Sequence, residues 1–156
     1  MKLAQALIER ADLQRKLAQL SARLQQNAQY QEGEAPAEDP QDLLTDYRRS
    51  AAALTRFIVA INRANHNVTL ADGTTMLAAL AERDRLKAEH TMLGKVADAA
   101  MADQSRYSRS EIRTLAAVDI RALRREADNV AKRCRELDIQ IQQANWENDI
   151  AEEEAG

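Results

Sequence analysis

The chain has 156 residues, a formal net charge of −3 at pH 7, 45% hydrophobic residues and one cysteine. This length is typical of one domain. The net charge gives no overall attraction to nucleic acid or anionic lipid, and a single cysteine excludes an intrachain disulfide. The longest strongly apolar run, Phe57–Ile61, is far shorter than the roughly 20 residues of a membrane span, and Glu9 and Arg10 come too early for a signal peptide, so we expect a soluble cytoplasmic protein.

The first predicted helix runs from about Lys2 to Asn27. Apolar residues recur in it at alternating intervals of three and four, which places them on one face of a helix. One charged residue interrupts the stripe, which consists of Leu3, Ala6, Arg10, Leu13, Leu17, Leu20 and Leu24. A connection from 28 to 42 follows, and its carboxylates make it strongly acidic.

The second predicted helix begins at Pro40, because Asp39 can cap it and proline suits the first helical position, and it ends near Asn65. Its expected apolar stripe is Leu44, Tyr47, Ala51, Leu54, Ile58, Ile61 and Asn65. The segment Val68–Thr75 then places Asp-Gly between β-prone residues, which predicts a short β-hairpin.

The third and fourth helices are predicted over Met76–Met101 and from Ile120 to about Asn148. Alternation of apolar and polar residues predicts a short strand over Ile112–Val118 between them. The expected stripe of the third helix is Ala79, Arg83, Leu86, His90, Leu93, Ala97 and Ala100. That of the fourth is Ile120, Leu123, Ala127, Val130, Cys134, Leu137, Ile141 and Ala144, which predicts a buried structural thiol at Cys134.

An internal repeat relates the two halves of the chain, since Ala6–Arg10 recurs as Ala79–Arg83 with leucines at matching positions after each arginine. We therefore predict an all-α fold of four long helices, arranged as two tandem antiparallel coiled-coil hairpins (1–65 and 76–148) in a bundle-like domain. The domain is predicted to cover 1–150, with minor β structure in the connections and an acidic disordered tail at 151–156.

A homo-oligomer is expected because several apolar residues beside the stripes, including Leu43, Phe57 and Ile139, have no obvious partner within one chain. The sequence names neither the number of copies nor a ligand.

Two arginines occupy equivalent positions on predicted inner stripes, Arg10 beside Glu9 and Arg83 beside Glu82. A buried arginine requires a carboxylate partner, so we predict a polar layer in the bundle made by these four residues. Exposed arginines on the helix faces and a site for an anionic ligand are the alternatives.

The second long connection is basic and contains Arg106, Tyr107, Arg109 and Arg113. We favour pairing with the acidic connection 28–42, within one chain or between chains. Ordinary solvated loops are the alternative, because exposed ion pairs contribute little. Binding of phosphate or single-stranded nucleic acid is a further hypothesis, which the nearby carboxylates weaken.

Catalytic, cofactor and metal sites are not predicted. The two histidines, His66 and His90, have no metal-ligand spacing, and the chain contains no glycine-rich phosphate loop and no nucleophile–histidine motif. The leading hypothesis is a non-enzymatic structural or interaction protein that forms a self-assembling helical scaffold.

Several short segments also resemble a known family. The segments that carry this resemblance are Leu7–Gln14, Gln31–Glu34, Glu38–Pro40, Arg106–Ile112 and Asn145–Trp146. The chain resembles small bacterial septicolysin-like proteins over nearly its whole length. The resemblance implies a helical, coiled-coil protein without known catalytic residues. The family name implies a membrane-active cytolysin as an alternative function.

Overall fold

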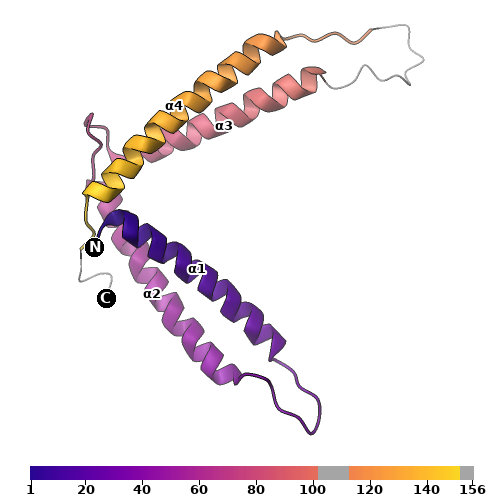
Figure 1. The fold of residues 1–156 in the computed structure, drawn as a ribbon, viewed down its shortest axis with the longest axis vertical. Coiled ribbons are helices and arrows are strands. Elements are labelled where there is room, and N and C mark those ends of the chain that lie inside the picture. The colour runs from indigo at the N-terminus through magenta and orange to yellow at the C-terminus, as the bar shows by residue number, and fades with distance from the viewer. Residues whose placement is uncertain (102–112, 152–156) are drawn as a thin grey trace. The chain divides into compact units, whose positions relative to one another are not determined.

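A computed structural model describes residues 1–101 and 113–151. Its helices, in chain order, are α1 (Leu3–Gln26), α2 (Pro40–Asn67), α3 (Met76–Met101) and α4 (Ile120–Glu147) (Figure 1). Each predicted helix is present and ends within two residues of its predicted limits, so the all-α prediction is confirmed. The predicted tail lies outside the described residues from 152 onward.

The helix starts follow from capping chemistry. At α2 the Asp39 carboxylate accepts a hydrogen bond from the N–H of Gln41 at 2.8 Å, and Pro40 takes the first helical position. At α4 the Asp119 carboxylate accepts from the N–H of Ala122 at 3.0 Å. These side chains satisfy backbone donors that have no partner inside the helix.

The described residues contain no β-strand, so the predicted strands are not formed among them, although Thr69 and Thr75, on either side of the predicted turn, are isolated β-bridge residues. Asp72-Gly73 does form a tight turn, in which the N–H of Leu70 donates to the carbonyl of Thr74 at 2.8 Å. However, α2 ends and α3 begins too close to this turn for a ladder to form. Residues 113–118 are irregular, since a strand needs a neighbouring strand to satisfy its backbone.

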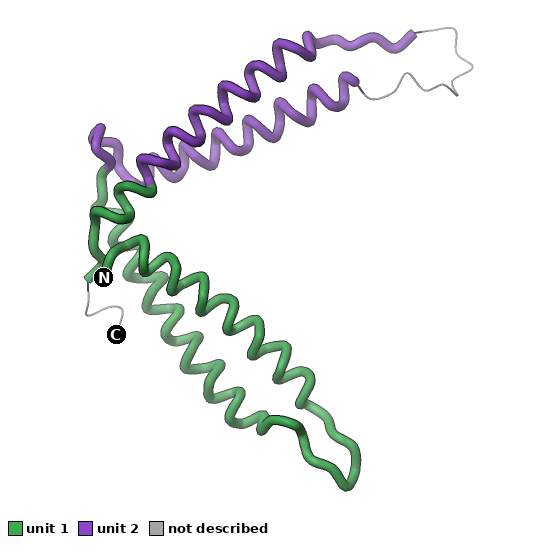
Figure 2. Tube along the Cα trace, viewed as in Figure 1, with its two compact units in different colours: residues 1–69, 142–156 green, residues 70–141 purple. Residues whose placement is uncertain are grey.

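The chain forms two compact units: unit 1 contains residues 1–69 and 142–156, and unit 2 contains residues 70–141 (Figure 2). Most of α4 therefore belongs to unit 2, while its last residues belong to unit 1.

In unit 1, α1 and α2 pack side by side and antiparallel, around fully buried Leu3 and Ile61 (Figure 1). The stripe predicted for α2 is displaced, because Phe57 is 8% exposed and Ile58 is 38% exposed. The helix turns its larger aromatic side chain inward, which buries more apolar area. Leu43 is also buried, so it and Phe57 no longer argue for an oligomer.

The N-terminal residues of unit 1 pair with the residues that follow α4. The N–H of Leu3 donates to the carbonyl of Asn148, and the N–H of Ile150 donates to the carbonyl of Met1, both at 2.9 Å. The Lys2 ammonium contacts the Asp149 carboxylate at 2.9 Å, and this contact holds the pKa of Asp149 below its usual value. The two segments are thus joined by backbone and charged contacts.

In unit 2, α3 and α4 pack antiparallel around a cluster of Leu86, Leu93 and Val130. Partly buried side chains surround this cluster, and Cys134 is one of them, which agrees with its expected place on the α4 stripe. Among the residues predicted on the α3 stripe, His90 is instead exposed. Gly94 has no atom within 4 Å of where a Cβ would lie, so no neighbouring helix requires a glycine there.

Candidate functional site

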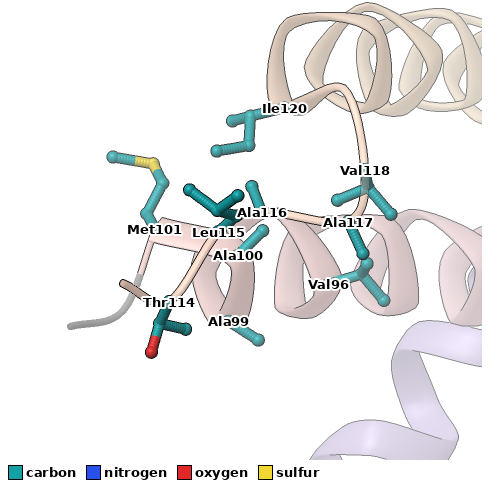
Figure 3. A pocket seen from close by; sticks show the side chains of 10 residues that line it. All are labelled: Val96, Ala99, Ala100, Met101, Thr114, Leu115, Ala116, Ala117, Val118 and Ile120. Atoms are coloured by element: carbon teal, nitrogen blue, oxygen red, sulfur yellow. The ribbon is translucent and has the colours of Figure 1, made fainter. Parts of the chain in front are cut away.

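An apolar recess of about 690 Å³ lies at one end of unit 2, between the last turns of α3 and the segment that leads into α4 (Figure 3). Its volume falls in the range of ligand-binding pockets, roughly 300–1,000 Å³. Thr114 carries the only polar side chain among its lining residues, which are Val96, Ala99, Ala100, Met101, Thr114, Leu115, Ala116, Ala117, Val118 and Ile120. The recess can receive an apolar group, but these side chains supply no acid or base for a reaction.

The outer face of α3 continues this surface with Ala88, Met92 and Val96. Met92 is 49% exposed, whereas Leu86 and Leu93 of the same helix are buried against α4. Ala88, Met92 and Val96 follow one another at intervals of four and so lie on one side of the helix. Helix α3 therefore has apolar residues on its outer side as well as on the side that faces α4.

A shallow groove of about 540 Å³ runs along this outer face and is flanked by Lys87 and Lys95. Val96 lines both the groove and the recess, so the two form one continuous apolar surface. Sequence analysis missed this surface because it followed one stripe per helix. The spacing of Ala88, Met92 and Val96, at intervals of four, was the available signal.

Arg83 pairs with a different carboxylate from the one that was predicted for the polar layer. Its guanidinium Nη1 lies 3.3 Å from the Asp138 carboxylate of α4, and its Nε lies 3.8 Å from Asp84. The Arg83 side chain is only 22% exposed. Successive side chains on a helix point about 100° apart, so Glu82 does not face the same direction as Arg83.

Glu82 instead belongs to a charged network on the surface of unit 2. Arg85 donates two hydrogen bonds of 2.8 Å to Glu82, and they hold the pKa of the Glu82 carboxyl below its usual value. Arg85 also contacts Glu89 at 2.8 Å, and Arg133 of α4 lies 3.7 Å from Glu82. These groups are well exposed, so the network contributes little stability and mainly favours this pairing of α3 with α4.

Arg10 lies half-buried on the inner stripe of α1, and its Nε is shielded from solvent without a hydrogen-bond acceptor. Within the described residues it makes no ion pair. Glu9 is exposed, and Asp12 contacts Arg15. The predicted pairing of Arg10 with Glu9 is therefore not formed in unit 1.

Most of the basic connection, including Arg106, Tyr107 and Arg109, lies outside the described residues, and Arg113 is exposed. In the acidic connection, Glu38 forms an ion pair with Arg23 of α1, which holds the pKa of the Glu38 carboxyl below its usual value. Pairing between the two connections stays a prediction.

The structure describes residues 1–101 and 113–151. Over these ranges, no three His, Cys, Asp or Glu side chains gather closely enough to hold a metal ion. In the same ranges, none of the helices has the length and apolar character needed to cross a membrane.

Similarity to known proteins gives the family. The model of a family of unknown function, DUF6847, matches residues 10–150. The chain belongs to this family. It is also similar to a protein of known structure, described as a functionally unknown conserved protein from Corynebacterium diphtheriae. That structure has 38% sequence identity and a TM-score of 0.89, and the match covers 97% of this chain and 99% of the other. No curated protein matches the chain.

The resemblance to septicolysin-like proteins was wrong, since the family match over 10–150 and the similar structure both point elsewhere. The cytolysin alternative rested on that family name and falls with it. The protein therefore belongs to an all-α family of unknown function.

Proposed function

We propose that this protein is a non-catalytic interaction protein of the cytoplasm that assembles with further copies of itself. The observation that carries the proposal is the continuous apolar surface formed by the outer face of α3 and the adjoining recess. A second copy is the simplest partner, because a symmetric contact buries the same surface from both chains.

The magnitude of the gain supports such a contact. Met92 keeps about half of its surface in water. Burying the rest of such a side chain contributes roughly 1 kcal/mol, and a symmetric contact counts each residue twice. Met101 (62% exposed) and Leu115 (73% exposed), at the rim of the recess, add further apolar area.

Light scattering after size-exclusion chromatography, over a range of protein concentrations, tests this proposal. We expect the wild-type chain to run as an oligomer and Met92→Lys to shift it toward the monomer, because a charge cannot be buried unpaired in the contact. Ile8→Lys is the matched control, since Ile8 is 53% exposed on α1, outside the proposed surface. A wild-type monomer at all concentrations, or equal masses for wild type and Met92→Lys, would refute the proposal.

A further inference from the structure

The two arginines on inner stripes differ in how their charge is satisfied. Arg83 has a carboxylate from the opposite helix at 3.3 Å, whereas Arg10 has no acceptor among the described residues. In both arginines the Nε is shielded from solvent without a hydrogen-bond acceptor, so they differ at the terminal nitrogens, where Arg83 contacts Asp138 and Arg10 contacts no carboxylate of the described residues. The guanidinium therefore has donors available for a group from outside the chain.

Helix α1 does not supply that group. Side chains that meet on a helix are three or four positions apart, and the residues at those distances from Arg10 are Ala6, Leu7, Leu13 and Gln14. None of these carries a charge.

Helix α2 does not supply it either, because its only carboxylates, Asp42 and Asp46, lie in its first two turns. The start of α2 lies beside the end of α1, where Glu38 contacts Arg23. At 1.5 Å per residue, Arg10 is about 24 Å from the end of α1 and Asp46 is about 9 Å from the start of α2, so about 15 Å separates them along the pair. An arginine side chain does not span that distance.

The rest of α2 carries positive charge in its sequence. Residues 47–67 contain no aspartate or glutamate, and their arginines include Arg48 and Arg56. A cation without a matched carboxylate, on a helix pair of the same sign, attracts anions from solution. Arginine binds carboxylate and phosphate oxygens through two parallel N–H donors.

We propose that Arg10 binds a small oxyanion, a carboxylate or a phosphate group, at the edge of the α1–α2 pair. The oxygens of the anion would accept hydrogen bonds from the Arg10 guanidinium, as the Asp138 carboxylate does from Arg83. This site is independent of the proposed self-assembly, because Met92 and the recess belong to unit 2 and Arg10 belongs to unit 1.

Thermal unfolding of the full chain tests the site, with phosphate and citrate compared against sodium chloride at equal ionic strength. For the wild type we expect an increase in unfolding temperature of about 3–6 °C at ten times the dissociation constant. Arg10→Met should abolish the increase, and Arg10→Lys should keep part of it. Lys16→Met, which removes an exposed cation from the same helix, should retain it. A response to phosphate but not citrate, or the reverse, would identify which oxyanion is bound.

Broadening of the phosphorus NMR signal of inorganic phosphate by wild-type protein, and its loss in Arg10→Met, provides a second measurement that does not depend on stability. The Met92→Lys variant should respond to anions as the wild type does, even if its oligomeric state changes. No anion response in the wild type, or an equal response in Arg10→Met, would overturn the proposal.

Discussion

The side of α2 that packs against α1 can be tested with two neighbouring residues. Phe57 is 8% exposed and Ile58 is 38% exposed, although the sequence pattern placed Ile58 on the inner stripe. We expect Phe57→Ala to lower the free energy of unfolding of unit 1 by about 3–5 kcal/mol, because nearly the whole ring leaves a cavity between the helices. Ile58→Ala should cost only about 1–2 kcal/mol, since its partly exposed site is open to water and encloses little cavity.

Urea unfolding followed by tryptophan fluorescence measures this difference. Trp146 is the only tryptophan and belongs to unit 1, so its fluorescence reports on the unit that contains both substitutions. With a dependence on urea of roughly 1–3 kcal/mol per molar, Phe57→Ala should lower the midpoint by about 2 M. If Ile58→Ala lowered the midpoint as much as Phe57→Ala or more, the inner stripe would pass through Ile58 and the packing described here would be incorrect.

Four further substitutions test local contacts. Gly73→Ala should destabilise the protein by about 1 kcal/mol, because Gly73 has φ +86°. Gly94→Ala should stabilise α3 by up to about 1 kcal/mol, because alanine favours the helix more than glycine does. Equal effects of the two substitutions in thermal melts would contradict both expectations. Asp138→Asn should lower the free energy of unfolding by about 1 kcal/mol, because it leaves the half-buried guanidinium of Arg83 without its carboxylate. An unchanged midpoint in chemical denaturation would show that the pair is not formed. The pKa of Asp149 is lowered by Lys2, so the stability that this contact provides is present above the usual carboxyl pKa of 3.8 and is lost as the pH falls through the lower folded value. Asp149→Asn should therefore remove part of the acid sensitivity of unit 1, as measured by fluorescence melts between pH 2 and 6, and identical profiles for the two proteins would exclude this role.

The helices and their limits could be predicted from the sequence because their signals are local. The stripe of α4 and the caps at Asp39 and Asp119 depend on residues within a few positions of one another. The side of α2 that packs inward could not be fixed in this way. Two sets of residues in α2 recur every seven positions: Leu43, Ser50 and Phe57, and the residues that follow each of them. Either set could form the inner stripe, and only packing against α1 decides which one is buried.

The candidate sites show the same division between local and distant information. Sequence analysis identified Arg10 and Arg83 as charges on inner stripes, which their half-buried positions in the structure agree with. It assigned the neighbouring glutamates as partners because nearness along the chain was the only information available. The partner of Arg83 lies on another helix, at Asp138, and depends on how α3 aligns with α4.

Helix α3 links the fold to the proposed function, because its two apolar sides serve different purposes. One side is held against α4 by Leu86 and Leu93, so folding of unit 2 leaves Met92 and Val96 facing water. A helix that had to fold only within its own chain would gain solubility from polar residues at those outer positions. The outer apolar residues are not needed to hold α3 against α4 in the cluster of Leu86, Leu93 and Val130, so the proposed contact with a second copy is the role that they fit.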